Sequence, residues 1–100
     1  FASSQRIEMH HSLPGYVTRY AETPVFTETT TPSKLTGDHN TKPGVWGKLV
    51  VISGVLDYVI PGPPEERKTI REGEFGIIEP EIYHHVQLAG PVQFQVEFYR

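Results

Sequence analysis

Short runs of β-branched and aromatic residues, separated by glycine and proline turns, constrain the fold of this chain more than any other feature. The last run alternates cleanly, with Val92, Phe94, Val96 and Phe98 on one face and mostly polar residues on the other. No stretch carries a convincing helical period. Strands at short, regular spacing are typical of an antiparallel sandwich or barrel, so we predict an all-β fold.

The turn signals divide the chain into expected strands. Ser53–Gly54 is a tight-turn signal, so the apolar runs on either side of it are expected to form an antiparallel hairpin. Pro61–Glu66 is expected to be a surface loop, because proline suits neither a strand interior nor a helix interior. The strands are predicted over residues 16–20, 25–27, 35–36, 45–52, 55–60, 67–71, 75–78, 84–88 and 92–99.

The length of the chain suits one domain. One hundred residues, 37% of them hydrophobic, bury a modest core. Residues 1–12 have no periodicity, and we predict an N-terminal tail there, in which His10 and His11 are solvated and Met9 is a candidate natural start. Residues 13–100 are predicted to form the single domain.

Charge and composition exclude several partners and compartments. The net charge of −3 and a pI near 5.9 give no footprint for nucleic acid or an anionic membrane. No apolar run approaches the ~20 residues that span a bilayer, and nothing resembles a secretory leader. The chain has no cysteine, which fits a reducing cytoplasm and means that any metal would be held by His, Asp, Glu or water.

Histidines lie beside the ends of predicted strands. His39 precedes the strand that begins near Trp46, and His84 and His85 follow Glu79. In a rolled antiparallel sheet such positions can face one another, and imidazole and carboxylate are good ligands for zinc, iron, nickel or manganese. Adjacent residues of a strand point to opposite faces, so at most one of His84 and His85 is expected to face the interior.

Two segments resemble the motifs of the cupin superfamily. The stretch from Gly73 through Pro80 to His84 is similar to the second cupin motif, and Asp38–Thr41 is similar to a degenerate first motif. The resemblance implies a jelly-roll β-barrel that holds one divalent metal ion on histidines and a glutamate. It also implies a homodimer built by pairing of an edge strand.

The same resemblance implies a ligand set. His39 matches the first histidine of motif one and His84 the histidine of motif two, whereas Thr41 replaces the second histidine of motif one and the glutamate position falls near Gly47. We therefore predict a divalent metal held by His39, Glu79 and His84. Possible further ligands, or residues that orient the ligands, are Glu97, His85 and Asp38, and the predicted ligand pocket contains Lys42, Thr41, Trp46 and Tyr83.

Each of these residues also has an ordinary structural interpretation. Glu79 can bond backbone amides where the strand breaks, and Lys42 can be a solvated loop residue. Trp46 can belong to the core, and Asp38 can be a turn residue. The residues alone leave these alternatives open.

Longer blocks are similar to the TehB-like (YeaR-like) family, which is associated with tellurite resistance: residues 23–27, 38–47, 78–84 and 96–98. This implies a metal-binding module for a small molecule or oxyanion. The alternative is a metal-dependent enzyme, dioxygenase-like or isomerase-like, acting on an oxygen-rich small molecule. Some relatives are joined to an S-adenosylmethionine-dependent methyltransferase. We do not expect that activity of this chain, because its sequence has no glycine-rich strand-to-helix loop.

Overall fold

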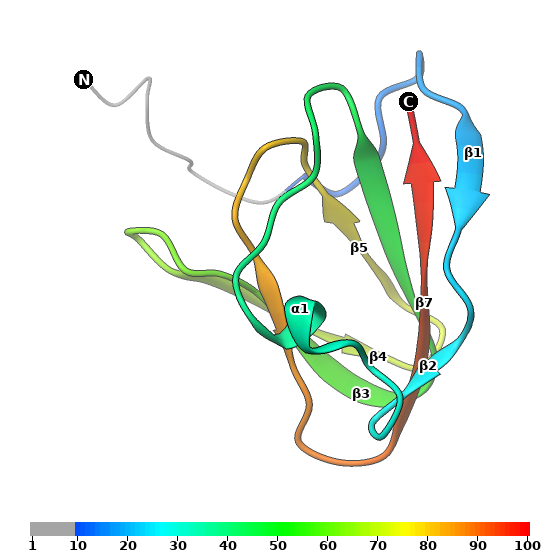
Figure 1. Ribbon diagram of the computed structural model, residues 1–100, viewed down its shortest axis with the longest axis vertical. Coiled ribbons are helices and arrows are strands. Elements are labelled where there is room, and N and C mark those ends of the chain that lie inside the picture. The colour runs from blue at the N-terminus through cyan, green and yellow to red at the C-terminus, as the bar shows by residue number, and fades with distance from the viewer. Residues whose placement is uncertain (1–9) are drawn as a thin grey trace.

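Strands make up nearly all of the regular secondary structure of the described residues (Figure 1). The computed structural model describes residues 10–100, so the prediction about Met9 lies outside the described residues. Every strand pairing among these residues is antiparallel, which confirms the all-β prediction. In chain order the elements are β1 (Arg19–Glu22), β2 (Phe26–Thr27), α1 (Ser33–Thr36), β3 (Trp46–Ile60), β4 (Glu66–Arg71), β5 (Phe75–Ile78), β6 (His85–Gln87) and β7 (Val92–Tyr99).

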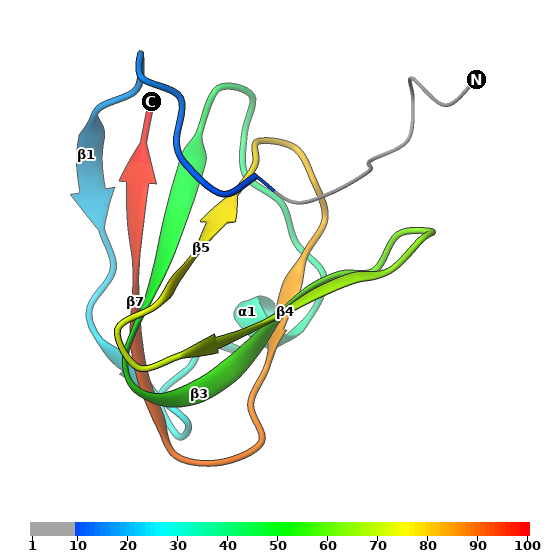
Figure 2. The same ribbon diagram turned by 180° about the vertical axis from the view of Figure 1, so that it is seen from behind.

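The long strand β3 belongs to two sheets. Its first half, from Trp46 to Gly54, pairs with β5 on one side and β7 on the other, and β7 in turn pairs with β1 and β2. Its second half, from Val55 to Ile60, pairs with β4 and β6. The register against β7 shifts between Val51 and Ser53. Such an irregularity bends a strand, and β3 turns here from one sheet into the other (Figure 2).

The predicted hairpin at Ser53–Gly54 is wrong, because the chain continues through this point as one strand. Gly54 has a φ of +80°, and a Cβ built there would lie 2.2 Å from the carbonyl oxygen of Pro91. The glycine therefore serves the bend of β3 and its close approach to the start of β7. A tight hairpin and a bend of this kind require the same residue.

The predicted strand at residues 35–36 is also wrong, because the segment Ser33–Thr36 is the short helix α1. Pro32 stands at its N-cap, where the missing amide costs nothing. The amide of Leu35 donates to the carbonyl of Pro32, and the amide of Gly37 donates to that of Ser33. Leu35 packs on the core from this turn of helix.

The core consists of apolar side chains from both sheets. The alternation predicted for the last strand is seen in β7, where Val92, Phe94 and Val96 are buried. Each large apolar side chain buried in this way stabilises the fold by about 1.5–3 kcal/mol. The buried cluster also contains Leu49, Val51, Leu56, Tyr58, Ile60, Ile70, Ile78 and Val86.

Polar side chains link the three strands of the second sheet, β3, β4 and β6, on the face that does not carry the core side chains Leu56 and Tyr58. Asp57 of β3 accepts hydrogen bonds from Thr69 and Arg67 of β4, at 2.7 and 2.9 Å. The Thr69 hydroxyl, and after it Arg67, lower the pKa of the Asp57 carboxyl. Arg67 also donates to Gln87 of β6 at 2.8 Å, so one guanidinium ties all three strands together. Within residues 10–100, no helix has the length and apolar character needed to cross a bilayer.

Candidate ligand-binding cavity

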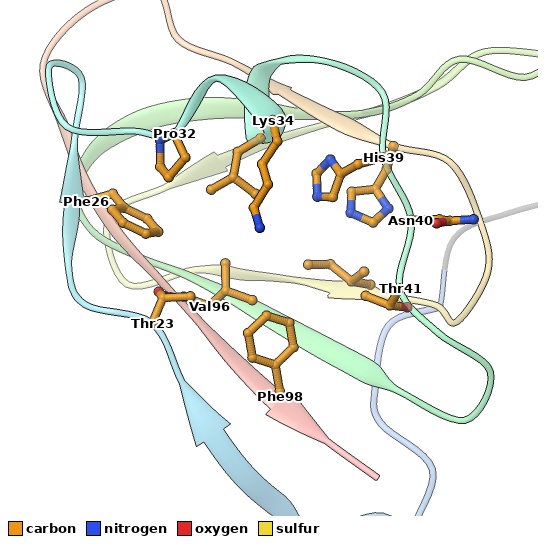
Figure 3. Close-up of a pocket in the computed structure, with 12 residues that line it drawn as sticks. Thr23, Phe26, Pro32, Lys34, His39, Asn40, Thr41, Val96 and Phe98 are labelled. Atoms are coloured by element: carbon orange, nitrogen blue, oxygen red, sulfur yellow. Dashed lines mark hydrogen bonds between the residues drawn. The ribbon is translucent and has the colours of Figure 1, made fainter.

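A cavity of about 380 Å³ opens between α1, the segment 39–41 and the strands β2, β5 and β7 of the first sheet (Figure 3). Most of its wall is apolar, and all but one of its polar side chains come from α1, the segment 39–41 and His84, the exception being Thr23 beside Val96. The lining residues are Thr23, Phe26, Pro32, Lys34, Leu35, His39, Asn40, Thr41, Ile78, His84, Val96 and Phe98.

His39 and His84 meet on one side of this cavity. The amide of His39 donates to the carbonyl of His84 at 3.0 Å, and the amide of His84 donates to the carbonyl of His39 at 2.9 Å. The two rings lie edge to face, with centroids 4.3 Å apart. The predicted convergence of these two imidazoles is therefore present in the structure.

Backbone carbonyls fix the proton position on both rings. Nδ1 of His84 lies 2.8 Å from the carbonyl oxygen of Ile82, and Nδ1 of His39 lies 3.1 Å from that of Gly37. A carbonyl oxygen only accepts, so Nδ1 is the donor in both pairs and the neutral rings carry a lone pair on Nε2.

His84 is held in the neutral form. Its side chain is 2% exposed, and this burial lowers its pKa from 6.5 to about 4. The hydrogen bond to Ile82 opposes that shift, and the neighbouring His39 adds to it. At neutral pH, Nε2 of His84 is therefore a hydrogen-bond acceptor.

Lys34 extends from α1 into the cavity (Figure 3). Among residues 10–100 its ammonium makes no hydrogen bond or ion pair, and none of the described lining residues is Asp or Glu. The hydroxyls that line the cavity are already engaged: Thr41 donates to Val45, and Thr23 donates to Pro24. Lys34 thus supplies an uncompensated positive charge next to apolar walls.

The sequence analysis missed Lys34. Its signal is weak, because a helix of four residues has no periodicity to show which side chains face inward. Proline before Ser33 was the available sign of a helix start. Asn40, Phe26 and Phe98 also line the cavity and were not predicted.

Glu79 and Glu97 do not reach the cavity. The Glu79 carboxylate lies 2.9 Å from Nδ1 of His10. Glu97 is on the opposite face of β7 from Val96, where it bonds Arg19 at 3.1 Å and the Tyr99 hydroxyl at 2.8 Å. Both carboxylates are therefore held elsewhere by partners distant from the two imidazoles. His10, predicted to be solvated, also packs its ring against Trp46.

His85 points away from its neighbour His84, as expected for adjacent residues at a strand. Its Nδ1 lies 2.6 Å from the carboxylate of Asp38, and its Nε2 lies 3.1 Å from the side-chain nitrogen Nε2 of Gln87. Asp38 therefore orients His85 and not His39, whose Nδ1 faces Gly37. Because Asp38 immediately precedes His39, this pair fastens the cavity segment to β6.

The predicted pocket residues separate into two groups. Thr41 lines the cavity. Trp46, exposed Lys42 and Tyr83, which is 59% exposed, are not among its lining residues.

The comparisons with known proteins agree on one family. Residues 21–96 match the model of the TehB-like domain. A protein named probable S-adenosyl-L-methionine-dependent methyltransferase TehB, from Haemophilus influenzae, is 32% identical in an alignment 89 residues long that covers 80% of this chain and 30% of that protein. The crystal structure of TehB from the same organism superposes with a TM-score of 0.71 at 29% identity, covering 83% of this chain and 31% of that one.

A second solved structure matches the fold over nearly its whole length. A protein from Escherichia coli K12 gives a TM-score of 0.81 at 23% identity and covers 89% of this chain and 95% of its own. At this identity the likeness shows the fold alone. The present chain spans about a third of the length of TehB.

The predicted divalent metal is wrong. Within residues 10–100, no group of three or more His, Cys, Asp or Glu side chains is arranged to hold a metal ion. The reason is the engagement of Glu79 by His10 and of Glu97 by Arg19, which leaves two imidazoles without a carboxylate. The cofactor named for the Haemophilus relative is S-adenosylmethionine and not a metal. The metal-dependent enzyme loses its basis with the metal.

The cavity does not suit S-adenosylmethionine either. That cofactor has a net positive charge, because its sulfonium and ammonium groups outnumber its one carboxylate, and the ammonium of Lys34 would repel this net charge. The described lining residues also offer no carboxylate to bind its ribose hydroxyls or its ammonium group. The arrangement suits a ligand with negative charge.

Proposed function

Because the chain belongs to the TehB-like domain family, and because Lys34 brings positive charge into its cavity, we propose that it binds a small anionic molecule beside His39 and His84. The uncompensated ammonium of Lys34 carries this proposal. Lys34 is exposed, so its ammonium is hydrated in the free protein, and an anion that pairs with it at the cavity also meets the apolar walls that line the cavity.

The resemblance to proteins associated with tellurite resistance makes oxyanions the first ligands to test. The imidazoles of His39 and His84 add polar groups next to Lys34, and the volume of about 380 Å³ lies in the usual range for small-molecule sites. On this proposal the protein is a binding module that captures its ligand without a metal ion.

Calorimetric titration and NMR together test this function. The purified protein is titrated with tellurite, selenite and short carboxylates at low ionic strength, and chemical shifts of the backbone amides locate the binding site. We expect saturable binding with shifts concentrated at Lys34, His39 and His84. Shifts confined to surface lysines such as Lys42, or none at all with every anion, would contradict the proposal.

A second candidate function follows from the match to TehB. Since the chain corresponds to about a third of that protein, it is also a candidate partner of an S-adenosylmethionine-dependent methyltransferase, to which it would deliver the bound anion. The test adds this chain to such a methyltransferase lacking its own TehB-like domain. A lower KM for the anion supports delivery, and an unchanged KM argues against it.

The homodimer and the relation to the cupin superfamily stay predictions. Sedimentation equilibrium over a range of protein concentrations tests the dimer directly. A single species with the mass of one chain, 11.3 kDa, at all concentrations would contradict it.

A further inference from the structure

The described walls of the cavity present a cation, a neutral acceptor and apolar surface, and a ligand has to satisfy all of them. Lys34 supplies the cation, and the apolar surface comes from Phe26, Leu35, Val96 and other side chains. The acceptor is the neutral imidazole of His84. The proposed anionic function uses only the first of these features.

The acceptor on His84 selects for a hydrogen-bond donor. Because Nδ1–H of His84 donates to Ile82 at 2.8 Å, the neutral ring has only its Nε2 lone pair to offer. The side chain is 2% exposed and lines the cavity, and Nε2 makes no hydrogen bond to the residues the structure describes. An acceptor that faces a cavity and has no protein partner favours a ligand that donates a hydrogen bond to it. An anion that carries no O–H or N–H group cannot make this hydrogen bond.

The size of the cavity selects for an apolar group. At about 30 Å³ for each water-sized group, a volume of 380 Å³ holds roughly a dozen such groups. An inorganic anion with three oxygens would fill about a third of it and would leave Phe26, Val96 and Phe98 in contact with water. A ligand with a short branched hydrocarbon chain covers these side chains and gains the free energy of their burial.

We infer that the cavity takes a small organic hydroxy acid, with its carboxylate on Lys34, its hydroxyl donating to Nε2 of His84 and its hydrocarbon part against Phe26, Val96 and Phe98. This inference rests on the proposed function and narrows it. It places bare oxyanions such as tellurite among the weaker ligands of the same site, because they have no hydrocarbon group to cover the apolar side chains.

Four carboxylates separate the contributions of the hydroxyl and the hydrocarbon. α-Hydroxyisovalerate has both groups, isovalerate has only the branched chain, glycolate has only the hydroxyl, and acetate has neither. Titration of the intact chain with each at neutral pH, and with tellurite, gives affinities in one buffer. We expect α-hydroxyisovalerate to bind most tightly, with the hydroxyl contributing roughly three- to tenfold and the branched chain roughly tenfold or more.

The outcomes separate the inference from the function on which it rests. If tellurite, acetate and α-hydroxyisovalerate bind equally well in the cavity, the inference fails and anion binding stands. If the organic acids bind but the hydroxyl adds nothing, the assignment of Nε2 as the acceptor is wrong. If no anion binds at the cavity, the proposed function fails as well.

Nitrogen NMR of the histidine rings tests the acceptor without altering the protein. Nε2 of His84 is expected at the unprotonated position and should move upfield when α-hydroxyisovalerate binds, but not when isovalerate binds. The His84→Gln variant keeps a polar group at this place, and we expect it to lose the preference for the hydroxylated acid. A protonated Nε2 in the free protein at neutral pH would overturn the inference even if the variant failed to fold.

Discussion

The backbones of His39 and His84 exchange two hydrogen bonds, and their rings lie 4.3 Å apart at the wall of the cavity. The segment that carries His39 is not a strand of either sheet, yet it is aligned by this bridge as a strand would be. The amide of Glu81 also donates to the carbonyl of Thr41 at 3.0 Å, which extends the alignment by a further bond. The position of one imidazole therefore determines the position of the other.

The stability of the protein should depend on pH through His84. Its pKa is lowered from 6.5 to about 4 by burial, so the unfolded chain takes up this proton near pH 6.5 and the folded chain only near pH 4. Between these values the unfolded state binds more protons. We expect the contribution of His84 to the free energy of unfolding to be complete above pH 6.5. As the pH drops to 4, the free energy of unfolding should fall by about 3 kcal/mol.

Urea denaturation at a series of pH values measures this effect. The His84→Gln variant should lose most of the pH dependence in this window, whereas His11→Gln, at an exposed position, should retain it. Equal pH dependence in the two variants would show that another group is responsible.

Removal of the Lys34 charge should weaken anion binding and leave the fold intact. The Lys34→Met variant keeps the length of the side chain, and we expect roughly tenfold or greater loss of affinity for an anionic ligand. The change in the free energy of unfolding should stay within about 0.5 kcal/mol, because the ammonium makes no contact that stabilises the described fold. Calorimetric titration and thermal melts measure the two quantities.

Lys42→Met is the matched control for this variant. Both lysines are exposed, but Lys42 does not line the cavity, so this variant removes the same charge from outside the proposed site. If the two variants lose affinity equally, the anion responds to net charge and not to the cavity.

Substitution of Gly54 should destabilise the protein more than substitution of Gly73 or Gly90. A Cβ at Gly54 combines a positive φ with a contact of 2.2 Å to the carbonyl of Pro91. We expect Gly54→Ala to cost about 3 kcal/mol or more. Gly73 has the same φ of +80° but no atom within 4 Å of the added Cβ, so Gly73→Ala should cost about 1–2 kcal/mol.

Gly90→Ala completes this series. A Cβ there meets nothing within 4 Å, and we expect a change of less than about 0.5 kcal/mol. Denaturant midpoints rank the three variants. A Gly54→Ala protein as stable as Gly73→Ala would mean that the approach of β3 to Pro91 is not tight in solution.

The contact between the Asp38 carboxylate and Nδ1 of His85 should help to place His39. The two groups lie 2.6 Å apart and the Asp38 side chain is 52% exposed, so we expect a coupling energy of only about 0.2–1 kcal/mol in a double-mutant cycle of Asp38→Ala and His85→Ala. Ligand affinity should fall a few-fold in either single variant, since the segment 39–41 is then held less firmly. Unchanged affinity in both variants would show that the contact between Asp38 and His85 does not help to place His39.

Much of the fold is predictable from local pattern. β7 was predictable because its alternation reports directly which side chains face the core, and the positions of Phe94 and Val96 agree with it. The course of β3 was not predictable. Ser53–Gly54 suits a hairpin as well as a bend, and the choice depends on Pro91, which lies far along the chain.

The candidate site was predictable only in part. The approach of His39 to His84 follows from their places at strand ends. The exclusion of Glu79 and Glu97 depends on contacts with His10 and Arg19 from the beginning of the described chain, which no local pattern reveals. Lys34 escaped prediction because one turn of helix has no period.

Since β3 lies between β5 and β7 in one sheet and between β4 and β6 in the other, the two sheets share one central strand. Cleavage of the chain at Ser53 would separate the first part of β3 from β5 and β7, whereas residues 55–60 would stay on one fragment with β4 and β6. Both fragments contribute residues to the lining of the cavity, so it would form again only if they reassociated.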